Sequence, residues 1–340
     1  MTGPRPVRVA VIGCGLIAQR SHLPSYAAAP EADLAAVVSG RRERAEAAAR
    51  EFGAARVLSS WEAAVADPGI DAIDICTPNA LHAPIAIAAA RAGKHVLVEK
   101  PMATSLAEAD AMVAAAREAN VTLMVAHNLR FVPIYQVIER AMRDGVIGRP
   151  FAARGMFMHA GPDEFWGATS DWFWQEANAG GGSLLDMGIH MIDLLRWMIG
   201  RRVIEVSAMI ARVLKPTFAD DNAFVLMRFE GDVLASVQSS WTARPAPDRQ
   251  ITIHGENGNI AMGRSTAEPL AFHLQVGTEA STIIPPIPAA SAIGDPFVHF
   301  VRSIQQGTEP LVTGEDGRDS LAIALAAYES ARTGHVVHLA

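Results

Sequence analysis

A short apolar run followed at once by closely spaced small residues constrains this chain most. The sequence VRVAVI, from Val7 to Ile12, is rich in β-branched residues, which is typical of a strand buried on both faces. Gly13, Gly15 and Ala18 follow it with the spacing G-x-G-x-x-A. In such a turn the first glycine allows the tight bend, the second lets the backbone approach a pyrophosphate, and the small third residue lets the next helix pack close to the strand. The pattern therefore predicts a dinucleotide site whose phosphates lie on a helix N-terminus.

Strand and helix signals alternate through the first 126 residues. This alternation predicts an α/β fold, with an N-terminal Rossmann doubly wound parallel sheet as a dinucleotide-binding domain over residues 1–126. Ligands of such sheets bind beyond the carboxyl ends of the strands. Strands are expected at 33–38, near 57, at 72–76, 95–99 and 122–126, with helices at 41–52, 80–92 and 104–119.

Polar residues gather where these strands end. Ser39-Gly40-Arg41-Arg42 follows the second strand, in the place of the acidic residue that would bind the ribose 2′-hydroxyl of NAD. A hydroxyl and two guanidiniums suit a 2′-phosphate, so NADP is the predicted cofactor and NAD the second choice. The alternative is that the two arginines are only the solvated first turn of the next helix. The expected cofactor-binding residues are Gly13, Gly15, Leu16, Ile17, Ala18, Ser39, Gly40, Arg41, Arg42, Thr77, Pro78, Asn79, His82, Glu99, Lys100 and Pro101.

Two of these groups follow the later strands. Thr77-Pro78-Asn79, with His82 close behind, stands at a helix entrance, where Asn and His are often capping groups instead of ligands. Glu99-Lys100-Pro101 places an ionisable pair at the crevice end of a buried strand, beside the expected nicotinamide.

Beyond residue 126 the pattern changes to α+β. It predicts a substrate-binding and oligomerisation domain over 127–340, built on a large, mainly antiparallel open sheet. Phe224, Val225, Leu226 and Met227 would place apolar side chains on both faces of one strand, and one helix covers only one face. A homodimer or homotetramer joined through that sheet is therefore expected. The expected helices are 132–143, 183–199, 296–306 and 316–332, and the expected strands 151–160, 203–213, 223–229, 233–241 and 250–254.

The expected helix over 183–199 is apolar almost all round, as a buried helix is. Asp186, His190 and Asp193 nevertheless share one stripe at i, i+4 and i+7. Buried polar groups are costly unless they are paired or used, so the stripe indicates catalysis and substrate binding by Asp186 and His190. The alternative is that Asp186 completes a capping box begun by Ser183, with His190 a hydrogen-bonded core histidine.

In this order and spacing, the motifs resemble those of the glucose–fructose oxidoreductase, inositol dehydrogenase and MocA-like oxidoreductase family. The resemblance implies an NAD(P)-dependent dehydrogenase or reductase of sugars, keto-sugars or cyclitols, with Lys100, Asp186 and His190 in the catalytic positions. Many members carry an Arg after the tryptophan of the loop before the glycine run, where this chain has Phe173. The matching pieces are the Gly13 turn, Thr77-Pro78-Asn79, Glu99-Lys100-Pro101, Gly180-Gly181-Gly182, Asp186-Met187-Gly188-Ile189-His190 and the hairpin at 254–258.

The implied reaction moves a hydride between nicotinamide C4 and a carbinol or carbonyl carbon. His190 is the expected general acid/base, and Lys100 is expected to hold the reacting oxygen. Trp166, Trp172 and Trp174 are the expected aromatic contacts to substrate, the alternative being that they pack between the domains. Two rival functions stay open, an NAD-dependent glycoside hydrolase of the same fold and a non-catalytic NADP-sensing regulator.

Composition and charge limit the partners and the location that we expect for this protein. The 340 residues carry a net charge of −7, and neither half of the chain is basic enough to favour a nucleic-acid partner. No apolar run of about 18 residues and no N-terminal signal stands out, so we expect a cytoplasmic protein without a membrane partner. The two cysteines, Cys14 and Cys76, are expected to be reduced, and no metal site is predicted.

Overall fold

The computed structural model describes residues 5–263 and 268–339, which divide into two compact units. Unit 1 is Met1–Asn128 with Ile293–Arg318, and unit 2 is Leu129–Ala292 with Asp319–Ala340. The first division falls two residues beyond the boundary expected at 126. The sequence does not predict that residues 293–318 return to unit 1. They do so because the helix α10 (Pro296–Gln306) packs apolar side chains such as Phe297 against the helix α1 (Leu23–Ala28) and the strand β1 (Val7–Ile12).

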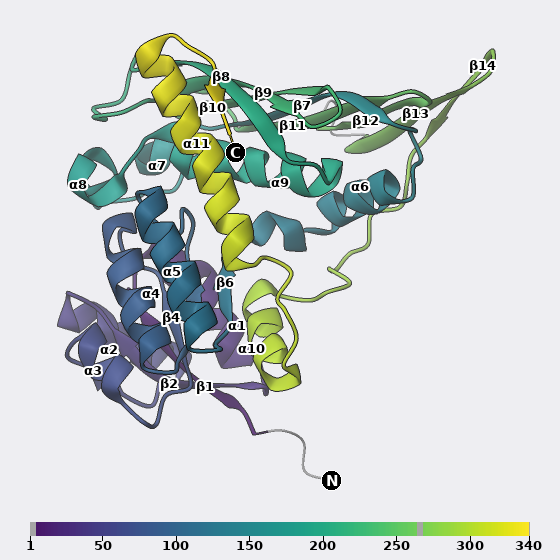
Figure 1. The fold of residues 1–340 in the computed structure, drawn as a ribbon. Coiled ribbons are helices and arrows are strands. Elements are labelled where there is room, and N and C mark those ends of the chain that lie inside the picture. Colours follow the sequence, from purple (N-terminus) through teal and green to yellow (C-terminus); the bar gives the residue numbers. More distant parts are fainter. Residues whose placement is uncertain (1–4, 264–267, 340) are drawn as a thin grey trace. The chain divides into compact units, whose positions relative to one another are not determined.

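Unit 1 holds a six-stranded parallel sheet in the order β3-β2-β1-β4-β5-β6 (Figure 1). The predicted Rossmann architecture is confirmed. The strand order reverses between β1 and β4, so the turns after these two strands flank the point where doubly wound sheets bind ligands. The strands are β1 (Val7–Ile12), β2 (Ala32–Val38), β3 (Val57–Leu58), β4 (Ala72–Ile75), β5 (His95–Val98) and β6 (Leu123–Val125).

Helices connect these strands. A π-helical turn, η1 (Ala18–His22), leads from the glycine turn directly into the first α-helix. The short third helix was not expected, because six residues are too few to show a helical period. The helices are α1 (Leu23–Ala28), α2 (Arg42–Phe52), α3 (Trp61–Ala66), α4 (His82–Arg91), α5 (Leu106–Glu118) and α10 (Pro296–Gln306).

Unit 2 holds a nine-stranded sheet in the order β14-β13-β12-β11-β7-β10-β9-β8-β15 (Figure 1). All of its pairings are antiparallel except that of β10 with β7, so the predicted mainly antiparallel sheet is confirmed. The hairpin expected at 254–258 joins β11 to β12, and the strands beyond residue 262 were not assigned from the sequence. The strands are β7 (Pro150–Met158), β8 (Val203–Ala211), β9 (Asn222–Phe229), β10 (Val233–Ser240), β11 (Asp248–Gly255), β12 (Gly258–Met262), β13 (Leu270–Val276), β14 (Glu279–Ile283) and β15 (Val337–His338).

One face of this sheet is covered by the predicted apolar helix. The helix begins as a π-helical segment, η5 (Leu184–Gly188), and continues as α9 (Ile189–Ile199), which packs on β7 and α6. The approach to β7 is close, because a Cβ added at Gly155 would lie 3.1 Å from Cβ of Met191. The other helices are α6 (Pro133–Arg143), α7 (Gly161–Glu164), α8 (Glu176–Ala179) and α11 (Gly314–Thr333). Among the described residues, no helix is both long and apolar enough to span a membrane.

Candidate active site

The turn after β1 has the form that a dinucleotide requires. Gly13 has a φ of 101°, and a Cβ there would lie 2.4 Å from the carbonyl oxygen of Cys76, so no other residue fits. A Cβ at Gly15 would have no described atom within 4 Å, which leaves open space on the side where a pyrophosphate would approach. Oγ1 of Thr77, after β4, is buried with no hydrogen-bond partner among the described residues. The open space at Gly15 and the buried hydroxyl of Thr77 fit a bound dinucleotide.

The turn after β2 holds the residues expected at the ribose. Oγ of Ser39 accepts the backbone N–H of Arg41 at 3.3 Å. Both Arg41 and Arg42 are exposed, and Nε of Arg42 lies 2.8 Å from Oε1 of Glu46, four residues along α2. An exposed pair of this kind contributes no more than about 1 kcal/mol, so it could yield to a phosphate. These contacts are compatible with both alternatives drawn from the sequence.

His82 joins two turns of unit 1. Its Nδ1 lies 2.8 Å from the carbonyl oxygen of Pro101, and its Nε2 lies 2.9 Å from that of Thr77. Burial lowers the pKa of His82, although the two carbonyl contacts oppose this change. Because backbone oxygens occupy both nitrogens, we infer that His82 holds the turns after β4 and β5 together and does not bind the cofactor through its ring.

Glu99, which is expected at the cofactor, has hydrogen-bond partners of its own within unit 1. Its Oε1 lies 3.0 Å from Nε2 of His22, and its Oε2 accepts the backbone N–H of Lys100 at 3.0 Å. Burial alone would raise the pKa of Glu99, but the hydrogen bond from His22 and the nearby charges lower it. Sequence reasoning missed His22, whose only signal was a histidine on the helix that follows the glycine turn.

In unit 2 the side chain of Asp186 is held by an indole. Nε1 of Trp241, which is 1% exposed, donates to Oδ2 of Asp186 at 2.9 Å. The capping-box alternative is wrong, because Oγ of Ser183 donates to Oδ2 of Asp220 at 2.6 Å and caps no backbone N–H. Asp186 is thus held by Trp241, the residue that follows β10.

Asp220 anchors the glycine run before this helix. Its carboxylate accepts hydrogen bonds from the hydroxyl of Tyr328 at 2.5 Å and from the backbone N–H of Leu184 at 2.9 Å. Burial raises the pKa of Asp220, and these hydrogen bonds partly offset that rise. A Cβ at Gly182 would lie 1.9 Å from the carbonyl oxygen of Asp220, so only glycine permits this approach. No pattern in the sequence pointed to Asp220, which lies 38 residues beyond Gly182.

His190 lies one turn beyond Asp186 on the same buried helix. Its ring is 8% exposed and lies 6.2 Å, between centroids, from the ring of Phe157 on β7. Beyond Phe157, the ring of His159 stacks on Phe165 at 4.5 Å. Aromatic rings therefore surround the two predicted catalytic side chains of this unit.

Asp193, the third residue of the stripe, belongs to a buried ion pair. Arg130 donates to it through Nε at 2.9 Å and Nη2 at 2.6 Å, and both side chains are at most 3% exposed. The Arg130 guanidinium also lies 5.5 Å from the ring of Trp197. Asp193 therefore ties α9 to the segment before α6. Of the three residues in the stripe, Asp186 and His190 remain the catalytic candidates, and Asp193 has a structural role.

The predicted aromatic contacts occupy different surroundings. Trp174 meets Trp241 edge-on at 5.7 Å, so it adjoins the indole that holds Asp186. Trp166 is 41% exposed and packs edge-on against Phe165 at 4.9 Å. Trp172 stacks on Phe173, the residue that replaces the expected arginine, at 3.9 Å.

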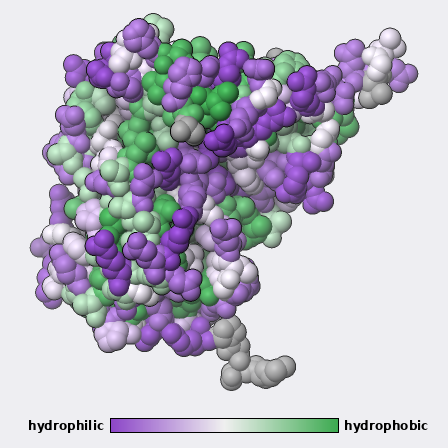
Figure 2. Space-filling view, in the orientation of Figure 1, coloured by the Kyte–Doolittle hydropathy of each residue, from purple (hydrophilic) through white to green (hydrophobic). Residues whose placement is uncertain are grey.

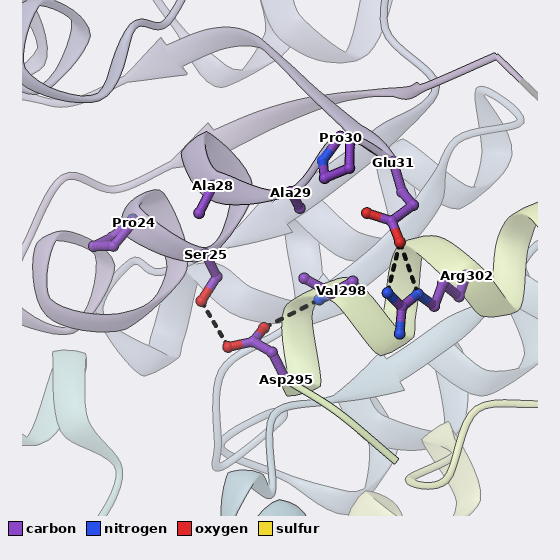
Figure 3. A pocket seen from close by; sticks show the side chains of 9 residues that line it. All are labelled: Pro24, Ser25, Ala28, Ala29, Pro30, Glu31, Asp295, Val298 and Arg302. Carbon is purple, nitrogen blue, oxygen red and sulfur yellow. Dashed lines mark hydrogen bonds and ion pairs between the residues drawn. The ribbon is translucent and has the colours of Figure 1, made fainter. Parts of the chain in front are cut away.

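A shallow pocket of unit 1 has none of these residues in its lining. It is formed by α1 and α10, where Ser25 donates to Asp295 and Arg302 pairs with Glu31 (Figure 3). The polar groups in its wall thus satisfy one another. Cys14 and Cys76 are both buried and not joined in a disulfide, and burial raises the pKa of Cys14 to about 11.

A Rossmann sheet with an open glycine turn, joined in one chain to a second unit whose buried helix carries Asp186 and His190 one turn apart, defines a dinucleotide-dependent enzyme. Residues 7–127 match the oxidoreductase family with an NAD-binding Rossmann fold, and residues 135–261 match the GFO/IDH/MocA C-terminal domain. The chain therefore belongs to the Gfo/Idh/MocA family. It is an NAD(P)-dependent oxidoreductase of the dehydrogenase and reductase class, which acts on CH–OH groups.

Similar proteins span almost the whole chain. D-apiose dehydrogenase of Paraburkholderia graminis is 33% identical and covers 97% of this chain and 89% of its own length. 1,5-anhydro-D-fructose reductase of Ensifer adhaerens is 33% identical over 98% of both chains. Among solved structures, levoglucosan dehydrogenase in complex with NADH and levoglucosan has a TM-score of 0.87 and 28% identity, covering 98% of this chain and 99% of its own.

Proposed function

We propose that this protein transfers a hydride between nicotinamide C4 of NADP(H) and a carbinol or carbonyl carbon of a sugar, keto-sugar or cyclitol. The observation that carries the proposal is the pair Asp186 and His190 on a buried helix, with Asp186 oriented by the Trp241 indole. The names of the relatives support the substrate class, since they include an apiose dehydrogenase, an anhydrofructose reductase and inositol dehydrogenases.

His190, Lys100 and Asp186 have separate proposed roles at the reacting carbon. When bound, the nicotinamide supplies or accepts the hydride. His190 moves the proton of the substrate hydroxyl, because an imidazole titrates near neutral pH. Lys100 holds the reacting oxygen and stabilises its alkoxide character as the hydride moves. Asp186 orients His190 or a neighbouring substrate hydroxyl.

Trp166, Trp172 and Trp174 are proposed to contact the substrate, because aromatic faces suit the apolar side of a sugar ring. Phe173 stands where many relatives have an arginine, so its stacking on Trp172 extends this aromatic group in place of a cation. The cytoplasmic location expected from the sequence stays a prediction.

Cofactor choice is tested by removing the two exposed arginines after β2. Replacing Arg41 and Arg42 with Ala should weaken NADP(H) binding by about 1.5 to 3 kcal/mol per lost charge-assisted contact and leave NAD(H) binding unchanged. Isothermal titration with both cofactors measures this difference. Equal weakening of NADP(H) and NAD(H) binding would show that the two arginines are only the solvated first turn of the helix. Arg44→Ala, on the same helix, serves as the control.

Assembly is proposed to use the uncovered face of the nine-stranded sheet. On β9 the side chains alternate, with Val225 and Met227 buried and Phe224 and Leu226 exposed. Met209 on β8 is 80% exposed, and hydrophobic side chains gather over this part of unit 2 (Figure 2). We propose a homodimer or homotetramer joined through this face, because an apolar sheet face of this kind usually marks an interface.

Leu226→Glu should convert the assembly to monomers, because it places a charge in the middle of the proposed contact. Light scattering at micromolar concentration measures the mass of both proteins. Glu230→Gln, a substitution in the turn after β9, is the matched control. A wild-type protein that is monomeric under these conditions contradicts the proposed assembly.

A panel of aldoses, keto-sugars and cyclitols, followed by NADPH absorbance, tests the reaction itself. A lasting change in absorbance on turnover identifies net hydride transfer. A glycoside hydrolase would cleave its substrate without such a change, and a cofactor-sensing regulator would turn over none of the panel. Either result would replace the proposed function.

A further inference from the structure

His22, Asp74 and Glu99 form a buried chain of hydrogen bonds beneath the turn that carries Lys100. Nδ1 of His22 lies 2.7 Å from Oδ2 of Asp74, and Nε2 of His22 lies 3.0 Å from Oε1 of Glu99. His22 and Asp74 are 0% exposed and Glu99 is 7% exposed. The ring of Phe297 packs 4.0 Å away, between centroids, on the His22 imidazole. All of these residues belong to unit 1.

The partners of His22 require a doubly protonated ring. A neutral imidazole has one N–H, yet both of its nitrogens face a carboxylate oxygen. Burial alone would lower the pKa of His22, but the charge of Asp74 and the contacts with Cys76 raise it well above the usual range. The Cys76 thiol, whose pKa burial raises, stays protonated and donates to Oδ1 of Asp74 at 3.6 Å. An imidazolium between the two carboxylates supplies a donor for both of these contacts.

Glu99 connects this chain to the catalytic turn. With Oε1 held by His22, its Oε2 accepts the backbone N–H of Lys100 at 3.0 Å. The carboxylate thereby fixes the backbone from which the Lys100 side chain leaves the sheet. A side chain that must hold one reacting oxygen depends on such support, since a displacement of about 1 Å can cost roughly 100-fold in rate.

We propose that His22 is a positioning residue that, held by Asp74, orients the Glu99 carboxylate and through it places Lys100 for the reaction. The proposal rests on the proposed catalytic role of Lys100. It adds three residues from separate elements, η1, β4 and the turn after β5, that do not themselves touch the substrate.

The same cluster offers atoms of the kinds that bind zinc. Nδ1 of His22, the carboxylate of Asp74 and Sγ of Cys76 all lie within 4.8 Å of one another. Nδ1 of His22 lies 2.7 Å from Asp74 and 3.2 Å from Cys76, which are hydrogen-bonding separations. Protons thus account for the contacts, and the metal content of the purified protein is part of the test.

Two substitutions of His22 separate positioning from packing. His22→Gln keeps a donor near the position of Nε2 and can still hold Glu99, whereas His22→Asn keeps only a donor near Nδ1 and releases Glu99. We expect kcat to fall by about 30- to 100-fold in His22→Asn and by less than about 10-fold in His22→Gln, with cofactor KM within about threefold of wild type. His95→Gln, at the opposite end of the same strand β5, is the control for loss of a half-buried, hydrogen-bonded histidine from unit 1.

The Lys100→Ala background shows whether His22 acts through Lys100. In that background His22→Asn should cause no further loss of kcat, because the group that it positions is absent. A further loss as large as in the wild type, or equal losses in the Asn and Gln variants, would overturn the proposal. Unchanged turnover in Lys100→Ala alone would instead contradict the proposed function, so the two failures can be told apart.

Two readouts do not depend on activity. Imidazole ¹H–¹⁵N spectra should show both ring nitrogens of His22 protonated at pH 8, where an unperturbed histidine, with a pKa of about 6.5, is neutral. The gain in Tm of wild type over His22→Gln should be full below that unfolded pKa and should narrow as pH rises through the raised folded pKa of His22. The titratable groups that face this ring are Asp74, Cys76 and Glu99, with Tyr26 and Lys100 beyond them. A neutral ring at pH 8, or one equivalent of zinc that is lost in His22→Asn, would overturn the proposal.

Discussion

Replacing His190 with alanine should lower kcat by about 10²- to 10⁴-fold, the usual cost of removing a general acid/base, while cofactor affinity barely changes. The expectation follows from an imidazole that is 8% exposed on a buried helix, one turn from a carboxylate held by Trp241. Steady-state kinetics and direct titration of the cofactor measure the two quantities separately. His273→Ala, on the distant strand β13, controls for loss of a histidine from unit 2.

Substitutions of Lys100 test the same catalytic step. Lys100→Arg should fail nearly as badly as Lys100→Ala, because a forked guanidinium cannot reproduce a compact ammonium at one oxygen. If both residues serve one step, the double variant of Lys100 and His190 should lose far less than the product of the single losses. Near-normal turnover in His190→Ala, with circular dichroism unchanged, would show that the stripe is structural and that another group moves the proton.

Asp193→Ala should reduce the free energy of unfolding by about 3 to 5 kcal/mol, because it leaves the charge of Arg130 buried without its partner. Both side chains are at most 3% exposed, and the pair is bidentate. Urea denaturation followed by tryptophan fluorescence suits the measurement, because Trp197 lies beside the Arg130 guanidinium. The double change Arg130→Met with Asp193→Leu should recover most of the loss, since apolar residues of similar volume often replace a buried pair without cost.

Glu139→Ala is the matched control for this pair. Glu139 pairs with Arg143 on the surface of α6, and an exposed pair of this spacing contributes about 0.3 to 0.5 kcal/mol. A loss in Asp193→Ala no larger than in this control would show that water or another group compensates Arg130. A loss of kcat in Asp193→Ala without loss of stability would show that Asp193 acts in catalysis and not in stability.

The predicted stripe shows what a local sequence pattern can predict about a site and what it cannot. Helical spacing predicted that Asp186, His190 and Asp193 share one face of a buried helix. It could not assign their roles, because the partner of Asp193 lies 63 residues earlier in the chain and the partner of Asp186 lies 55 residues later. The capping box failed for the same reason, since Ser183 bonds to Asp220 instead of its own helix.

The sequence by itself determined what depends on neighbours in the chain. The β-branched run from Val7, the bend at Gly13 and the alternation of strands and helices are local, so they predicted the Rossmann sheet and the place of its ligand. Only the tertiary structure decided which polar groups meet. His22 reaches Asp74 and Glu99, and Asp220 reaches Tyr328, across 52, 77 and 108 residues. A hydrogen bond between such distant residues requires the correct packing of whole elements, and no spacing in the sequence records that packing.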